Sequence, residues 1–295
     1  MGVEVHMLNE TDAAEALLAH VGRSYDGGCV LVDAGAVAMY AEATQDEHIR
    51  YYGDGAIAPP MFHVRPMRDL LFAIMEDPEL QLDMLRLVHA EHDARFHLPV
   101  RVGEVMHLRG KLTHLEQKSR GLLVEAKLMG FVDNQVAVKA RTSFYIRGQM
   151  VAPVGTGKRS LPVRVEGAGP PSHVRTWRVA ADQSRQYAEA SLDRNPIHLD
   201  AAVARAGGLP DVILHGLCTM AMTGRTVLDA VGNGDPLRLR RLGLRWARPV
   251  LNGSALSTRI WAGDPGDDGV ALIKFDVVDS SGEQVVKLGI AEVGP

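Results

Sequence analysis

Hydrophobic and polar positions alternate along six segments of the chain, three in each half. Alternation with a period of two is typical of a strand that buries one of its faces. The segments are rich in Val, Leu and Phe, and short turns such as Asp133-Asn134 and Ser281-Gly282 separate some of them. We therefore predict antiparallel strands, joined by hairpins, at 104–116, 121–132, 135–147, 254–262, 269–278 and 284–292.

A helical pattern precedes the strands in each half. From about His215 onward, apolar or small residues recur at helical spacing and form one buried stripe: Leu217, Met220, Ala221, Gly224, Val227, Leu228 and Val231. The counterpart in the first half is shorter, because Pro66 and Pro78 bound it. Two antiparallel sheets, each wrapped around a helix, make an α+β molecule of two similar units.

The two halves also repeat one another in sequence. YAEATQDEHIRYY at 40–52 begins like YAEASLDRNPIHL at 187–199, and we expect each copy to lead from a strand into a loop. RFHLPVRVGE at 95–104 then resembles RWARPVLNGS at 245–254, and QVAVK at 135–139 resembles QVVK at 284–287. Because the order is the same twice, we infer a duplicated unit.

A segment dense in Gly and Pro separates the repeats. Residues 148–174 have neither helical nor strand periodicity, which predicts a linker between domains at 1–147 and 175–295. Its GTGKRS superficially resembles a phosphate-binding loop. However, that pattern requires Gly where the chain has Ala152 and Ser or Thr where it has Arg159, so a nucleotide site is not expected.

Composition narrows the classes of function. Hydrophobic residues make up 46% of the 295, enough to fill two ordinary cores. The net charge of -4 gives no electrostatic reason to expect nucleic acid as a partner. Two cysteines cannot form a disulfide framework, and no apolar run is long enough for a membrane span. With no signal-peptide pattern, we expect a cytoplasmic protein with no membrane role.

The residues best suited to catalysis lie in the second half, between the YAEA segment and the start of the predicted long helix. Asp193 and His198 stand five positions apart around Pro196, so both side chains could meet one water as acid and base. Gly216, at the start of the long helix, offers a backbone N–H to a developing negative charge. Helix packing is the alternative role for this glycine. Asn195 is better suited to bracing the loop.

The segment from 187 to 222 resembles the signature of the (R)-specific enoyl-CoA hydratases, the MaoC-like dehydratases, which have a hot-dog fold. The matching residues are Tyr187, Ser191, Asp193, Asn195, Pro196, Ile197, His198, Gly207, His215, Gly216 and Leu217. ARPVLNG at 247–253 resembles the strand entry of the family, and the repeat extends the likeness to a double hot dog. One residue departs from the family, which usually has Gly where this chain has Leu192.

The resemblance implies reversible hydration of trans-2-enoyl thioesters to (R)-3-hydroxyacyl thioesters. Asp193 and His198 would activate the water, the Gly216 N–H would bind the thioester oxygen, and Asn195, His215 and Leu217 would contact the substrate. It implies no metal and no cofactor beyond the thioester itself, carried by CoA or by an acyl carrier protein. We also expect that two chains can pair as a homodimer.

The first half lacks the counterparts of His198 and of the Gly216 N–H. In register, Asp46 matches Asp193, but Tyr51 stands where His198 provides an imidazole. Before the shorter helix the sequence reads APPMF, and proline has no N–H to donate. We predict that this half is non-catalytic and, by the resemblance, that it accommodates the acyl chain.

Alternatives remain open on the sequence alone. Hot-dog folds also host thioesterases, and a non-catalytic acyl-thioester binder is a third hypothesis. An arginine run could meet the phosphates of CoA or an acidic carrier protein, or could be the solvated face of a strand: Arg238, Arg240, Arg241, Arg245 and Arg248. His89, His92 and His97 lie close together, but no Cys or carboxylate spacing completes a metal site. Ser280 and Ser281 fit a hairpin turn better than a hydrolase nucleophile.

Overall fold

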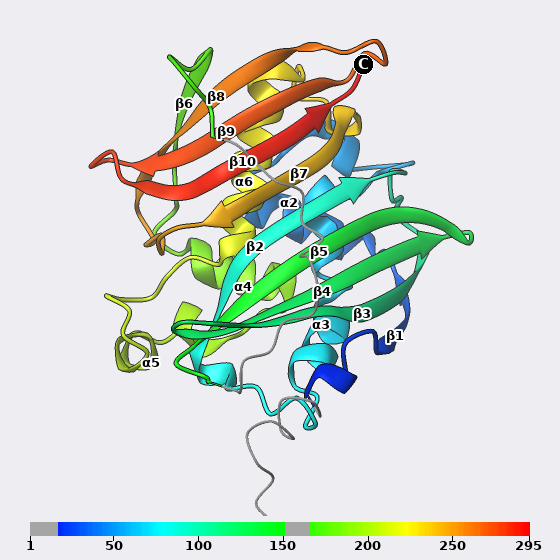
Figure 1. Ribbon diagram of the computed structural model, residues 1–295. Coiled ribbons are helices and arrows are strands. Elements are labelled where there is room, and N and C mark those ends of the chain that lie inside the picture. Colours follow the sequence, from blue (N-terminus) through cyan, green and yellow to red (C-terminus); the bar gives the residue numbers. More distant parts are fainter. Residues whose placement is uncertain (1–16, 151–165) are drawn as a thin grey trace, which may run out of the picture.

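The computed structural model describes residues 17–150 and 166–295. Within these ranges ten strands form one antiparallel sheet in the order β1-β3-β4-β5-β2-β7-β10-β9-β8-β6 (Figure 1). The first half contributes β1 (Ser24–Leu31), β2 (Leu87–Phe96), β3 (Val105–Lys118), β4 (Gly121–Val132) and β5 (Gln135–Arg147). The second half contributes β6 (His173–Arg178), β7 (Leu239–Trp246), β8 (Ala255–Pro265), β9 (Ala271–Asp279) and β10 (Gln284–Val293).

The strand order is the same in both halves. Read from the outer edge inward, β1-β3-β4-β5-β2 corresponds to β6-β8-β9-β10-β7, and the halves meet where β2 pairs with β7. The predicted duplication is therefore confirmed. The two expected sheets are joined edge to edge into one, so neither β2 nor β7 is left as an exposed edge.

The six predicted strands correspond to β3, β4, β5, β8, β9 and β10, whereas β1, β2, β6 and β7 were not predicted. β1 and β6 are largely exposed edge strands with little alternation. β2 and β7 carry charged residues on the outer face of the sheet, and these residues are compensated across the strand pair. Arg241 of β7, only 4% exposed, donates to the Asp93 carboxylate of β2 at 2.9 and 2.7 Å.

Each half places one helix against the inner face of its strands. Helix α6 (Gly216–Val231) packs on β7, β8 and β10. Its predicted stripe is buried except for the half-buried Leu217 and Val231, but residues off the stripe, such as Cys218 and Met222, are buried as well, so the helix is enclosed on more than one face. Helix α3 (Arg68–Met75) packs on β1, β3 and β4 and is half as long, as the flanking prolines indicated. No helix of the described ranges is long and apolar enough to span a bilayer.

The prediction that each YAEA segment leads from a strand was wrong. Both segments end helices, α2 (Ala34–Ala43) and α4 (Gln183–Ser191), which pack on each other. Alanine-rich composition favours a helix, and Asp33 caps α2 by accepting from Ala36 N at 2.8 Å. The repeated tyrosines meet at this contact, with the hydroxyls of Tyr40 and Tyr187 3.3 Å apart.

Short helices complete the described structure. They are η1 (Ile49–Tyr51), η2 (Pro60–Val64), η3 (Met84–Arg86), η4 (Pro196–His198), α5 (Ala201–Ala206) and η5 (Pro236–Arg238). Most of the predicted linker, residues 151–165, lies outside the described ranges.

Candidate active site

The candidate site begins where α4 ends. Leu192 follows the helix in a left-handed conformation, with φ of +65°. Glycine adopts this conformation without steric cost, which explains why Gly is usual at this position in the resembling family. Ser191 stabilises the same turn, since its hydroxyl donates to Tyr187 O at 2.7 Å and accepts from Asp193 N at 3.2 Å. The chain thus reverses here despite the leucine.

Two side chains fold the next residues into the η4 turn. The Asp193 carboxylate accepts from Asn195 N at 3.2 Å, and Asn195 Oδ1 accepts from Ile197 N at 3.3 Å. Pro196 occupies the first position of η4, where its missing N–H costs nothing. Asn195 therefore braces the loop, as the sequence suggested, and the turn brings His198 back toward Asp193.

His198 has a defined tautomer. Its Nδ1 lies 2.8 Å from the carbonyl oxygen of Ile213, so this nitrogen must carry the proton that it donates. The neutral ring then has an unprotonated Nε2, which can accept a proton. Burial lowers the pKa of His198, an effect that the nearby Asp193 carboxylate and the Ile213 hydrogen bond oppose. The imidazole is therefore neutral near pH 7 and ready to act as a base.

His215 stacks on His198 and supports the loop from below. The ring centroids are 3.7 Å apart with an interplanar angle of 26°, and His215 Nε2 donates to Asp193 O at 2.9 Å. Burial lowers the pKa of His215 well below its usual value, and His198 lowers it further. His215 Nδ1 is buried and has no hydrogen-bond partner among the residues described. These contacts indicate that His215 positions Asp193 and His198, in addition to the substrate contact that the sequence predicted.

Asp193, His198 and His215 form a cluster that the sequence had not indicated as a metal site. One potential ligand atom from each lies within 4.8 Å of the others. A metal ion must lie in the plane of each imidazole at about 2.0–2.1 Å from its nitrogen. Two rings stacked almost in parallel at 3.7 Å do not direct their nitrogens to one such point. The geometry fits proton transfer better than metal binding.

The N-terminus of α6 faces the same space. His215 is the N-cap residue but makes no side-chain capping bond, so the first amides of the helix are open to a ligand. Gly216 is the first helical residue. A Cβ at this position would lie 2.9 Å from the indole of Trp246, whose Nε1 donates to Gly216 O at 3.0 Å. The packing role considered for this glycine is therefore real, and Gly216 also lines the cavity described next.

A cavity of about 400 Å³ connects these groups. Every site residue named from the sequence lines it: Asp193, Asn195, His198, His215, Gly216 and Leu217. The opposite wall comes from the first half and is mostly apolar, with Leu71, Phe72, Met75, Leu87 and Phe144. Sequence analysis had assigned the acyl chain to the first half without naming these residues, and it missed Trp246, Arg68 and Arg147, which line the cavity too.

The arginine run does not act as one group. Arg248 lines the cavity, and Arg245 is exposed on β7. Arg241 is neither a solvated nor a substrate-facing residue, because it is buried against Asp93 and Glu292. The expectation for Arg241 was therefore wrong. Of the clustered histidines, His89 lines the cavity and stacks near Trp246, with ring centroids 4.5 Å apart, whereas His97 is exposed elsewhere.

The first half contains the same framework with different chemistry. Ala58 N donates to Val100 O at 2.8 Å, as Leu214 N donates to Val250 O at 2.7 Å. The bridges Ile57–Arg101 and Ile213–Leu251 also correspond. This correspondence puts Pro59 and Pro60 where the second half has His215 and Gly216. Tyr51, in the place of His198, donates to the Asp46 carboxylate at 2.9 Å.

Comparison with known families agrees with the geometry. Residues 166–283 match the model of the MaoC like domain. The chain therefore carries a MaoC-like domain. The resemblance predicted from residues 187–222 is confirmed by this match. Residues 19–139 match the dehydratase domain region of FAS1-like proteins.

Similar proteins extend over both halves. Probable enoyl-CoA hydratase 2 of Dictyostelium discoideum is 25% identical over 268 residues, which cover 88% of this chain and 90% of that protein. A solved MaoC-like dehydratase from Phytophthora capsici is 23% identical, with a TM-score of 0.78 over 95% of this chain and 98% of that one. A Mycobacterium tuberculosis protein described as having a double hotdog fold has a TM-score of 0.63 at 14% identity and covers 92% and 95%. The predicted double hot-dog fold is confirmed.

Proposed function

We propose that this protein catalyses the reversible hydration of trans-2-enoyl thioesters to (R)-3-hydroxyacyl thioesters. The observation that carries the proposal is the pair formed by Asp193 and the unprotonated Nε2 of His198, facing the open N-terminus of α6 in one cavity. The MaoC-like domain and the dehydratase region support the same reaction class.

Each group has a part in the reaction. Asp193 and His198 hold a water, and His198 Nε2 accepts its proton while the water oxygen adds to Cβ. The imidazolium formed is stabilised by the Asp193 charge, which raises the pKa of His198. The same proton is then delivered to Cα. The Gly216 N–H meanwhile stabilises the negative charge on the thioester oxygen, a contribution typically worth about 2.7–4 kcal/mol.

We further propose that the acyl chain lies against the first half and that CoA carries it. The apolar residues of α3, η3, β2 and β5 line the same cavity as Asp193 and His198. Arg68, Arg147 and Arg248 lie on the lining, where cations could meet phosphate groups. Arg248 is paired with Glu283 and Arg68 with Asp69, both at 2.6 Å, so Arg147, which donates only to Gly207 O at 3.2 Å, is the strongest candidate.

Crotonyl-CoA tests the reaction directly. Hydration is measured as loss of the enoyl-thioester absorbance, and a thiol reagent reports any free CoA. We expect hydration without thiol release, and a loss of about 10²-fold or more in kcat/KM for Asp193→Asn and His198→Ala.

Asp46→Asn is the matched control, because Asp46 holds the equivalent position in the first half and contacts Tyr51 rather than an imidazole. It should retain near-normal activity. Thiol release without hydration would instead favour a thioesterase, and an equal loss in Asp46→Asn would contradict a single site per chain.

A further inference from the structure

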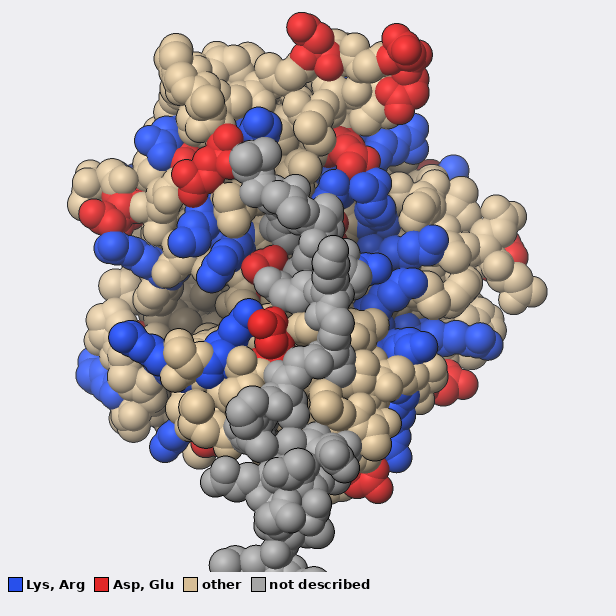
Figure 2. All heavy atoms as spheres, viewed as in Figure 1, with Lys and Arg blue, Asp and Glu red and all other residues tan. Residues whose placement is uncertain are grey.

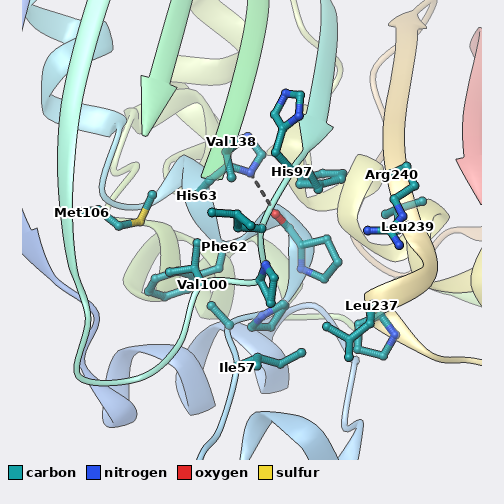
Figure 3. A pocket seen from close by; sticks show the side chains of 17 residues that line it. Ile57, Phe62, His63, His97, Val100, Met106, Val138, Leu237, Leu239 and Arg240 are labelled. Atoms are coloured by element: carbon teal, nitrogen blue, oxygen red, sulfur yellow. Dashed lines mark hydrogen bonds between the residues drawn. The ribbon is translucent and has the colours of Figure 1, made fainter. Parts of the chain in front are cut away.

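A second cavity, of about 250 Å³, lies at the other side of the junction between the halves (Figure 3). Figure 3 shows Ile57, Phe62, Val100 and Met106 of the first half on one side, with Leu237, Leu239 and Arg240 of the second half facing them. The lining is mostly apolar, and its polar side chains are His63, His97 and Arg240. Such a surface is suited to a hydrocarbon rather than to a polar ligand.

This cavity is the counterpart of the candidate active site. Its wall includes Pro59 and Pro60, which stand where His215 and Gly216 stand in the other half. Neither proline has an N–H to stabilise an oxyanion. His63 is buried in the wall, and its Nδ1 donates to Pro60 O at 3.0 Å. The cavity is therefore built from segments that correspond to those of the candidate active site, whereas Asp46, the counterpart of Asp193, lines a separate small cavity.

The opening is positively charged. Arg240 lines the cavity, is exposed, and forms no ion pair within the described ranges. His97 also lines it, but partial burial and the nearby charges of Lys139 and Arg95 lower the pKa of His97, so Arg240 is the cation of the lining. An apolar space with one guanidinium at its opening is complementary to a chain that ends in an anion.

A row of cations continues from this opening over the outer face of the sheet. Lys127 faces Lys111 on β3 and Arg141 on β5, and Lys139 faces Arg95, which is itself paired with Glu292. Figure 2 shows Lys and Arg side chains gathered over this part of the sheet, to the right of the grey segment. Like charges directly opposite one another destabilise a strand pair, so a bound anion would relieve the repulsion.

We propose that this second cavity is a non-catalytic binding site for an amphipathic anion with a hydrocarbon chain. The chain fills the cavity and the anionic head group binds Arg240. A volume below the ~300 Å³ at which pockets for whole small-molecule ligands begin fits a chain of medium length, with the head group outside. A free fatty carboxylate carries its charge at the end of the chain, whereas an acyl-CoA carries its phosphates beyond a neutral thioester and the pantetheine arm, so the two ligands are tested separately. The site is separate from the proposed reaction and does not depend on it.

Calorimetric titration with decanoate and, separately, with saturated decanoyl-CoA tests the proposal, since neither can be hydrated. We expect an equivalent whose affinity falls about tenfold or more in Arg240→Ala, and decanoyl-CoA should show a further equivalent, at the active-site cavity, that Arg240→Ala leaves unchanged. Arg245→Ala is the matched control, because Arg245 is an exposed cation on the same strand that lines neither cavity. A second variant, Leu237→Trp, fills the cavity and should abolish that equivalent.

Crotonyl-CoA hydration by the same variants separates the two sites. The hydration rate should be unchanged in Arg240→Ala and Leu237→Trp. If neither the wild type nor any variant hydrates crotonyl-CoA, the proposed reaction fails, but the result of the titration is unaffected. Arg240-dependent binding of decanoate alone identifies a carboxylate ligand, and Arg240-dependent binding of decanoyl-CoA identifies a thioester. The proposal is overturned if neither ligand binds, or if Arg240→Ala and Leu237→Trp bind both as the wild type does.

Discussion

Single backbone positions decide how the active-site loop turns. Leu192 and Gln45 occupy equivalent places before Asp193 and Asp46, and both have a left-handed backbone, with φ of +65° and +54°. A non-glycine residue in this region is strained by roughly 1–2 kcal/mol. The site therefore tolerates strain at the residue that directly precedes its carboxylate.

Replacing Leu192 with glycine should relieve that strain. Leu192 is 39% exposed, so little buried surface is lost, and we expect Leu192→Gly to raise the free energy of unfolding by about 1 kcal/mol. Urea unfolding measures the effect. Gln45→Gly should give a similar gain in the other half, and a marked destabilisation by Leu192→Gly would show that the leucine side chain holds the loop.

The residues of the candidate site could be predicted because they lie close together in the sequence. Asp193, Asn195 and His198 share one turn, and Gly216 begins the next long helix. Trp246 could not be predicted, because its importance comes from a contact with Gly216 across 30 residues. The support that His215 gives to Asp193 O also depends on the folded loop rather than on a pattern.

Strand β2 and the short helix η2 contribute buried histidines that link the two cavities. His63 lines the second cavity, His89 lines the candidate active site, and His92 lies between them, 3.4 Å from His63 between Nε2 atoms. Burial lowers the pKa of His63 to about 4 and that of His89 to about 3. Both rings are therefore neutral in the folded protein at neutral pH.

These histidines should make stability depend on pH. The unfolded chain binds a proton at each near pH 6.5, whereas the folded protein does not, so their contribution is fully present above pH 6.5 and decreases as the pH falls. For His63 alone, we expect a loss of about 3 kcal/mol between pH 6.5 and pH 4. Urea unfolding at several pH values measures it. His63→Leu should flatten the slope, and an unchanged slope would contradict this assignment.

Alternation was a good guide to strands that bury one face and a poor guide to the others. β3 alternates clearly and was predicted within two residues at its end. β2 and β7 carry Asp93 and Arg241 on a buried part of the outer face, where pairing across the halves replaces the usual exposure. The local sequence around Asp93 does not reveal that its partner, Arg241, lies 148 residues away.

At the scale of the whole molecule, the junction of β2 and β7 holds the halves together. Arg241 is hydrogen-bonded to Asp93 and to Glu292, and Glu292 in turn pairs with Arg95. Gly243 faces Asp93, where a Cβ would lie 2.6 Å from the carboxylate. The junction is thus closely packed and its charges are compensated.

Removing one partner of the buried pair should be costly. We expect Arg241→Ala to lower the free energy of unfolding by about 3–5 kcal/mol, because Asp93 loses its main compensating charge. Asp93→Leu combined with Arg241→Met should recover most of that loss. Arg245→Ala, on the same strand but exposed, should change stability by less than about 0.5 kcal/mol, as measured by denaturant unfolding. Equal effects at Arg241 and Arg245 would contradict a structural junction.

Each cavity takes one wall from each half of the chain, and this shared construction has a consequence for how the protein can be divided. Residues 166–295 contain Asp193, His198 and Gly216 but not the apolar surface that faces them. The molecule is in effect a heterodimer whose two subunits share one polypeptide. If the halves were produced as separate chains, activity would return only when they associate, and its rate would depend on the concentration of both.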